Sequence, residues 1–539
     1  MNKLKSFFKY DRVFLLAILL IGLMTAFSYG VYFDQVSEQT ILFSNIKEYA
    51  LRLGGEDSKL VQDMNKAGII EISQDKERDH GIAAYYPAGI VWLLNQVSPY
   101  AGSVFWHMYT FLLVFLGICA LYYLCKGLFQ SQKLASFISL LFFLSPRMFA
   151  ESHYNNKDMV LLSLVLMLFY GGYLVITKPS WPSIILFAIA GAYAFNVKII
   201  GAYFFGLLGL YALLYFICTR QFNKRLFIKV ISCLLLWLGI FVLITPATWV
   251  GPVEYVQYVF GHTVNFGRWS SYILFNGTLI HKEITGIPES YLPRLILFTT
   301  PVGILLLTAA GGLLLAVNTC KKRFRGIWQR EGYVIFLILT GLVPIVFAMV
   351  ADTSVYNGWR HFYFTYASLI MAAGYGAYGL NQLFKTKLPS KLRLGGAGIY
   401  AAVLAVGILL NHPFEYCYYN PLAGKNVAYK YDMDYWDLSV WQAYEAILED
   451  AGDKGKISVS AFNAPTIYGM EINRDALPQE ESGRILVLEN WENAEYLIVN
   501  MTYTVMYNLE DYQYVKAQYE LIETLESYGN LVCEVYKAK

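Results

Sequence analysis

The sequence predicts an all-α polytopic membrane protein that ends in a small extracytoplasmic α/β domain. Hydrophobic residues make up 57% of the 539 residues and charged residues only 15%, whereas a soluble globular protein carries about 25% charged residues. The hydrophobic residues are gathered into long runs, and these runs stop near residue 412. The composition therefore excludes an ordinary soluble fold, and no basic tract indicates a nucleic-acid partner.

The first apolar run follows a short basic N-terminus. The run 12–33 is longer than the apolar region of a signal peptide and no small-residue cleavage site follows it, so we expect an uncleaved membrane helix. A weaker run at 85–97 contains Pro87 and is expected to be interfacial or re-entrant. About eleven runs in all are long enough to cross a bilayer, at 12–33, 103–125, 134–149, 159–177, 182–197, 199–218, 226–247, 292–317, 333–351, 361–384 and 394–411.

Lysine and arginine residues indicate how these spans are threaded. With the N-terminus inside, every inner loop carries at least one Lys or Arg, which is the bias of cytoplasmic loops. An odd number of spans then places the C-terminus outside. We therefore expect a multi-pass plasma-membrane protein with a cytoplasmic N-terminus. The expected inner loops are 125–133, 177–181, 219–225, 321–330 and 385–393.

Three longer segments, at 34–84, 248–291 and beyond 412, are expected on the outer side. In the first, apolar residues between Ile41 and Ala50 share one helical face, which is typical of a helix lying on the membrane surface. In the last, the pattern predicts a helix at 440–449 and strands at 456–462, 484–488 and 495–500, followed by a terminal hairpin formed by 519–525 and 531–536.

We therefore divide the chain into a transmembrane module over 1–412 and an α/β domain over 413–539. Cys417 and Cys533 are the cysteines expected outside the spans on the outer side, which leaves a disulfide between them open. No spacing of Cys and His residues suggests a zinc site.

Ionisable residues gather at the span ends that face outward. Each has an ordinary explanation by itself: Asp34 could end a span and cap a helix, Lys198 could extend toward the interface, and His361 could be structural. Because the threading rule disfavours Lys and Arg at short outer turns, the set as a whole indicates a site. Its members are Asp34, Glu38, Arg147, Glu151, His153, Lys157, Asp158, Lys198, Arg360 and His361.

Cations beside carboxylates are what sugar transfer from a lipid-linked donor requires. The cations would hold an anionic lipid phosphate, and a carboxylate would take the proton of an incoming hydroxyl. A transporter or flippase of lipid-linked sugar intermediates is the alternative, and a structural membrane protein is a third hypothesis. A transporter is expected to show repeat symmetry and mid-membrane charges, whereas here the charges lie at one face and no repeat is evident.

Several stretches resemble the GT-C glycosyltransferases, in particular the bacterial branch related to dolichyl-phosphate-mannose protein mannosyltransferases and to aminoarabinose transferases. The most specific ones are Ser152–Asp158, which is similar to the family pattern SHxNxKD, and Asn357–His361. The others are Asp34 after the first run, Ser145-Pro146-Arg147, Phe275–Gly277 with Ile287–Pro293 and Thr300-Pro301, and His412-Pro413 with Tyr416, Tyr419-Asn420 and Asp434-Tyr435-Trp436.

The resemblance implies a GT-C enzyme whose cavity opens to the outer face and which needs no metal or other cofactor. The implied donor is a polyprenyl-phosphate monosaccharide, and the sugar is transferred with inversion to an acceptor hydroxyl on a protein, an envelope glycan or a lipid. Membrane lipids would surround the enzyme. The sugar and the acceptor are not specified by the sequence.

The resemblance also implies roles for individual residues. Asp34 corresponds to the general base, and Lys198, Arg360 and His361 correspond to residues that hold the donor phosphate. Asp158 and Lys157 would shape the acceptor side or orient the base. Many family members have an Asp-Glu pair where this chain has Asp34-Gln35, so Glu38, one helical turn later, is a further catalytic candidate. The remaining candidates for substrate binding are Arg147, His153 and His262.

Overall fold

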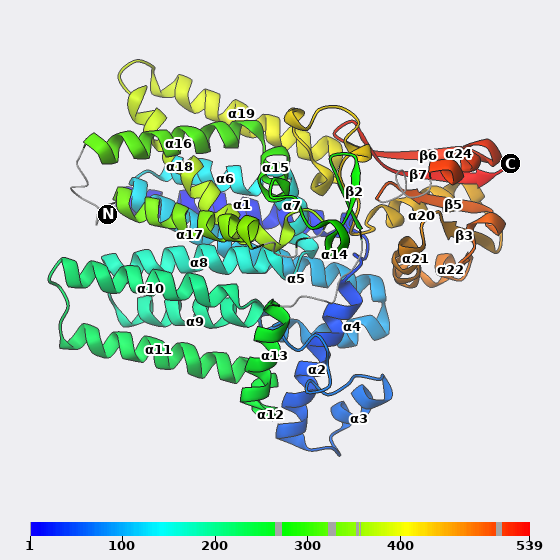
Figure 1. Ribbon diagram of the computed structural model, residues 1–539, viewed down its shortest axis with the longest axis horizontal. Helices are drawn as coiled ribbons and strands as arrows, with labels where there is room; N and C mark the ends of the chain where they lie inside the picture. Colours follow the sequence, from blue (N-terminus) through cyan, green and yellow to red (C-terminus); the bar gives the residue numbers. More distant parts are fainter. Residues whose placement is uncertain (1, 265–271, 322–329, 352–354, 356, 503–508) are drawn as a thin grey trace.

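The computed structural model describes residues 2–264, 272–321, 330–351, 355, 357–502 and 509–539. Its main part is a bundle of long helices, and a sheet with flanking helices stands at one end of the bundle (Figure 1). Among the described residues, eight helices are long and apolar enough to cross a membrane, or nine if a bent pair forms one span. The predicted fold class is therefore confirmed, whereas the predicted number of eleven spans is not.

The helices follow the predicted apolar runs. The eight long ones are α1 (Asn2–Thr25), α5 (Pro99–Phe129), α8 (Asp158–Thr177), α10 (Ile200–Cys218), α11 (Lys224–Ile244), α16 (Val302–Lys321), α17 (Arg330–Val350) and α19 (Ser390–Asn411). The bent pair is α6 (Gln132–Phe143) and α7 (Pro146–Tyr154), at 70°. The two other predicted runs correspond to the shorter α9 (Trp181–Val197) and to α18 (Tyr366–Leu383), which follows the 3-10 turn η3 (Arg360–Thr365).

The first helix ends earlier than predicted. After α1 and the short turn η1 (Ala26–Ser28), the segment 29–33 is not helical. Val31 pairs with the side chain of Asn473, which accepts from its N–H at 2.9 Å and donates to its carbonyl at 2.8 Å. Tyr29 and Tyr32 are buried. Residues 29–33 are largely apolar and pack inside the protein. They extend the apolar run beyond the end of the membrane helix, so the run overestimates the length of the span.

A second predicted run, 292–317, is also interrupted. The structure divides it into α15 (Tyr291–Thr299) and α16, with Pro301 directly before the second helix. The residue before a proline is disfavoured in the helical region, and Thr300 adopts an extended conformation, with ψ at 134°. The run is therefore two helices.

The expected outer segments meet at one end of the bundle. Figure 1 shows α2 (Gln35–Gly54), α3 (Lys59–Lys66) and α13 (Pro252–Val264) at the end that carries the C-terminal sheet, while the α10–α11 connection lies at the opposite end. Helix α2 crosses the end of the bundle, as a surface helix would. It is more buried than predicted, because Leu42, Lys47 and Glu48 are enclosed by protein.

The C-terminal region is built around a five-stranded sheet with the order β4-β3-β5-β7-β6. Strand β3 is parallel to β4 and β5, and β7 is antiparallel to β5 and β6. The predicted helix and strands are confirmed. They are α20 (Ser439–Ala451), β3 (Ile457–Ala461), β4 (Ile485–Val487), β5 (Tyr496–Asn500), β6 (Tyr519–Ser527) and β7 (Asn530–Ala538), joined by the helices α21 (Ala464–Ala476), α22 (Gln479–Ser482) and α24 (Leu509–Gln518).

The terminal hairpin has the turn that its sequence requires. Tyr528 and Gly529 join β6 to β7 with φ angles of 50° and 71°, and a two-residue hairpin turn with positive φ at both positions favours glycine. The disulfide left open by the sequence is not formed, since Cys417 and Cys533 are both buried free thiols.

A buried carboxyl joins the sheet region to a hairpin of the second outer segment, made of β1 (Tyr272–Phe275) and β2 (Thr278–His281). The N–H of Leu274 donates to Oδ1 of Asp432 at 3.0 Å. Burial raises the pKa of Asp432 from 3.8 to about 7, and the hydrogen bond from Leu274 opposes the shift only in part. Asp432 therefore keeps its proton in the folded protein at mildly acidic pH.

This shift predicts that stability falls as the pH rises. Between about pH 4 and pH 7 the unfolded carboxyl has lost a proton that the folded one keeps, so the stabilisation is complete below this window and is lost on crossing it upward. Asp432→Asn, which keeps the oxygen acceptor, is expected to raise the Tm in detergent at about pH 8 and to flatten its pH dependence. Asp453 is exposed, so Asp453→Asn is the control. If the Tm of wild type and of Asp432→Asn had the same pH dependence, the raised pKa of Asp432 would be contradicted.

Candidate active site

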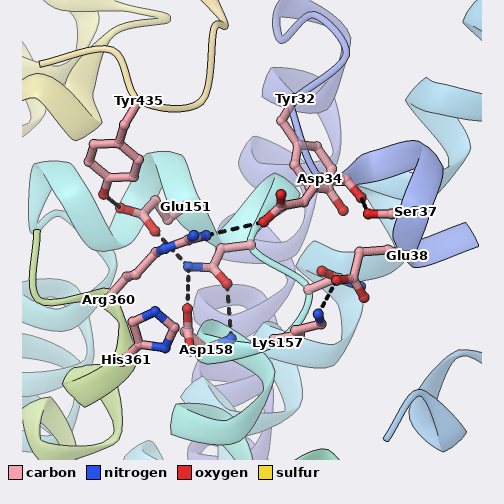
Figure 2. A network of polar contacts seen from close by, with 12 residues as sticks. Tyr32, Asp34, Ser37, Glu38, Glu151, Lys157, Asp158, Arg360, His361 and Tyr435 are labelled. Carbon is pink, nitrogen blue, oxygen red and sulfur yellow. Dashed lines mark hydrogen bonds and ion pairs between the residues drawn. The ribbon is translucent and has the colours of Figure 1, made fainter. Parts of the chain in front are cut away.

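Asp34 lies directly before α2 and faces Arg360. Its side chain makes no capping hydrogen bond to the helix, although an aspartate at this position commonly does. Instead, Nη1 of Arg360 donates to Oδ2 of Asp34 at 3.3 Å (Figure 2). The Asp34 side chain is 36% exposed and that of Arg360 is 12% exposed. Asp34 is therefore a partly exposed carboxylate that a cation orients.

Glu38 lies one turn further along α2 in a different environment. Its side chain is buried and forms an ion pair with Lys157. Nδ2 of Asn156 also donates to Oε2 of Glu38 at 3.1 Å. Both carboxylate oxygens therefore have partners, and the pair fastens α2 to the turn between α7 and α8 (Figure 2).

Asp158 begins α8 and is paired in the same way. It forms an ion pair with Lys198, which lies in the turn between α9 and α10. Nζ of Lys198 also lies 3.4 Å from Nδ1 of His361. Because an ammonium group can only donate, Nδ1 of His361 is the acceptor of this contact. The predicted phosphate-binding residues Lys198, Arg360 and His361 thus come together beside Asp158.

A third buried acid, Glu151, lies behind these pairs. Its Oε1 accepts from the hydroxyls of Tyr363 at 2.5 Å and of Tyr435 at 3.1 Å. Burial and the Glu151 carboxylate raise the pKa of Tyr435 well above its ordinary value, so the phenol stays protonated as a donor. Nη1 of Arg147 in turn donates to the Tyr435 hydroxyl at 3.4 Å. Arg147 is thus joined to the network through a tyrosine.

The motif Asn357–His361 places two of these side chains. Gly358 has a φ of +78°, a left-handed conformation in which a side chain would be strained, and a Cβ there would lie 3.4 Å from Nη1 of Arg147. The following Trp359 donates from its indole to Oγ1 of Thr299 at 2.7 Å. This anchor to α15 fixes the turn from which Arg360 and His361 project.

The motif Ser152–Asp158 forms the turn from α7 to α8. Oδ1 of Asn155 accepts from the N–H of Asp158 at 2.9 Å, which satisfies a free donor at the start of α8. Its Nδ2 donates to Oε2 of Glu151 at 2.7 Å. One asparagine therefore orients two acids, and the next two residues, Asn156 and Lys157, hold Glu38.

Two predicted binding residues lie elsewhere. His153 is buried against α1, and its Nε2 lies 2.9 Å from the carbonyl oxygen of Gly22. His262 lies on α13, where Nδ1 donates to the carbonyl of Tyr258 at 2.9 Å and the two rings are in contact. His153 thus contacts α1, His262 contacts its own helix α13, and a role for either in binding stays a prediction.

A group that could hold a metal ion lies in the first outer segment. The ligand atoms of Glu77, Asp79 and His80 lie within 4.8 Å of one another, and Nδ1 of His80 is 2.9 Å from Nζ of Lys157. All three residues are half-buried, and Nδ1 of His80 also lies 2.6 Å from Oε2 of Glu77. The expectation that the protein needs no metal stays a prediction.

The structure adds four uncharged residues to the predicted site. Asn155, Asn156, Tyr363 and Tyr435 supply the neutral hydrogen bonds that orient its acids. Three of them lay in stretches already singled out, but amides and phenols carry no charge and so were not collected with the ionisable set.

No protein-family model and no curated protein matches the chain. Among solved structures, ArnT from Cupriavidus metallidurans aligns over 98% of both chains at 12% identity. The TM-score is 0.48 for the crystal structure bound to undecaprenyl phosphate and 0.46 for the apo state. The Archaeoglobus fulgidus oligosaccharyltransferase in complex with Zn and sulfate aligns over 90% of this chain and 68% of that chain, with 12% identity and a TM-score of 0.42.

Proposed function

We propose that the protein is an inverting glycosyltransferase that moves a sugar from a polyprenyl-phosphate monosaccharide to an acceptor hydroxyl on the outer face of the membrane. The observation that carries the proposal is the difference between the acids. Glu38 and Asp158 are buried in ion pairs, whereas Asp34 is partly exposed beside the guanidinium of Arg360. A base and a phosphate-binding cation thus stand next to each other at the end of the bundle where the outer segments meet.

The reaction follows from this arrangement. Asp34 takes the proton of the acceptor hydroxyl while the hydroxyl oxygen attacks the anomeric carbon. The bond from the anomeric carbon to the phosphate oxygen breaks, and its electron pair leaves with the polyprenyl phosphate. Arg360 and Lys198 stabilise the charge that develops on this leaving group. A single displacement inverts the anomeric centre.

The ion pairs constrain how the donor enters. Arg360 already contacts Asp34, and Lys198 already contacts Asp158. A donor phosphate therefore shares each cation with a carboxylate. At Arg360 this sharing weakens the hold on Asp34 and makes its carboxylate a better proton acceptor, so donor binding would prepare the base. Glu38 and Asp158 orient Lys157 and Lys198 and take no proton.

Mass analysis of membrane lipids and surface glycans tests the function. Cells with the intact protein are expected to carry a glycan or lipid modification that is lost in cells with Asp34→Asn, while a polyprenyl-phosphate sugar accumulates. If cells with the wild type and cells with an equal amount of Asp34→Asn protein had the same glycans and lipids, the proposal would be contradicted. A lipid sugar that accumulates only on the inner leaflet would favour a flippase.

The proposal also places the site outside the plasma membrane, with the N-terminus in the cytoplasm. Lys224, in an expected inner loop, and Arg268, in the second expected outer segment, should lie on opposite sides of the membrane. Because Arg268 lies outside the described residues, we use Lys454 of the C-terminal region as the outer position. In a cysteine-free background, a membrane-impermeant maleimide should label Lys454→Cys in intact cells and Lys224→Cys only after lysis. Labelling of Lys224→Cys in intact cells would reverse the topology.

A further inference from the structure

Trp436 connects the C-terminal region to the residue next to the proposed base. The carbonyl of Trp436 accepts from the N–H of Phe33 at 3.0 Å, and Phe33 directly precedes Asp34. The side chain is 3% exposed. Its ring meets the ring of Tyr32 edge to face, with 5.6 Å between the centroids. Trp436 therefore packs against the segment that leads into Asp34.

A further contact of Trp436 is with Arg360, the cation that pairs with Asp34. The guanidinium carbon of Arg360 lies 4.3 Å from the centroid of the Trp436 ring, which is within the range of a cation–π interaction. The Tyr435 ring is more distant from the same carbon, at 6.0 Å. Trp436 thus contacts Arg360 through its ring and the residue directly before Asp34 through its main chain.

Trp436 contacts the Arg360 guanidinium with the face of its ring. Its indole N–H is buried and has no hydrogen-bond partner among the described residues. Arg360 is largely buried and an arginine side chain has many rotamers, so a flat aromatic surface restricts the guanidinium to one plane. The ring of Trp436 and the carboxylate of Asp34, at 3.3 Å, thus both act on the guanidinium.

We propose that Trp436 is a positioning residue that holds the Arg360 guanidinium in place to receive the donor phosphate beside Asp34. This inference rests on the proposed function. It makes the C-terminal region part of the proposed donor site. The effect of Trp436 on the ligand passes through Arg360, and this dependence can be measured.

The test uses the purified full-length protein in detergent, with undecaprenyl phosphate as the probe and its affinity as the readout. Trp436→Leu removes the ring and should weaken binding about tenfold, whereas Trp436→Phe keeps an aromatic face and should stay within about threefold of wild type. Trp441→Leu is the matched control. The Trp441 ring stacks on Tyr100, with 5.4 Å between the ring centroids, and its indole N–H donates to Glu445. Loss of this ring should leave undecaprenyl phosphate binding unchanged.

A double variant separates positioning from general stability. If Trp436 acts through Arg360, Trp436→Leu should cost nothing further once Arg360→Ala is present. Additive losses, equal binding by Trp436→Leu and wild type, or equal losses for Trp436→Phe and Trp436→Leu would each overturn the inference. If Trp436→Leu does not fold, Trp436→Met takes its place. Failure of the wild type itself to bind undecaprenyl phosphate would instead overturn the proposed function.

Discussion

Asp34→Asn is expected to lower sugar transfer about 10²- to 10⁴-fold, the range that a general base contributes. The amide is nearly the same size as the carboxylate but cannot accept the proton of the acceptor hydroxyl. The side chain makes no cap to α2, so the variant should fold and insert like the wild type. Turnover of purified protein with a panel of polyprenyl-phosphate monosaccharides measures the effect.

The same substitution should leave the donor site intact. Because Asp34→Asn removes the charge that competes for Arg360, we expect undecaprenyl phosphate to bind as tightly as in the wild type or more tightly. Asp475→Asn is a matched control, since Asp475 is another exposed aspartate paired with an arginine, Arg474, at 2.7 Å. Substantial turnover by folded Asp34→Asn protein would remove Asp34 from the mechanism.

Arg360→Ala is expected to weaken donor binding by about ten- to a hundredfold, the worth of a charge-assisted contact to phosphate. The KM for the acceptor should change much less, because the acceptor hydroxyl contacts the base. Lys198→Ala should act in the same direction. Arg360→Lys should restore only part of the affinity, since an ammonium cannot make the paired hydrogen bonds of a guanidinium.

Lys454→Ala is the control for the loss of a cation at another position in the protein. Lys454 lies in the C-terminal region and pairs with Glu495 at 2.5 Å, away from the proposed donor site. Affinities for undecaprenyl phosphate by titration, and KM values for donor and acceptor, distinguish the two substrates. Unchanged donor affinity in both Arg360→Ala and Lys198→Ala would show that the phosphate binds elsewhere.

The parts of the fold that follow from local periodicity could be predicted from the sequence. The helix α20, the strands of the sheet and the apolar runs other than 12–33 and 292–317 lie close to where their patterns placed them, because each pattern reflects the environment of one element. The prediction that the first helix extends to Phe33 was wrong, because the apolar residues of 29–33 pack against protein. Hydropathy does not distinguish burial in protein from burial in lipid.

The pairing of the site residues could not be predicted. The sequence put Asp34 and Glu38 one turn apart as similar acids, yet only Asp34 remains partly exposed. Glu38 is buried because Asn156 and Lys157, in the turn between α7 and α8, pair with it. These residues are far from Glu38 in the sequence, so no local pattern predicts the contact. For the same reason, Trp436 could be quoted as part of a motif but not placed on Arg360.

The hydrogen bonds around the segment before Asp34 bear on the order of biosynthesis. Asn473 holds Val31 and Trp436 holds Phe33, and both come from sequence that is translated after every predicted span. While the spans insert one after another, the backbone at 29–33 lacks these partners. A complete set of inserted helices is therefore not yet an assembled site, and a chain truncated after residue 412 should reach the membrane without a correctly placed Asp34, the proposed base.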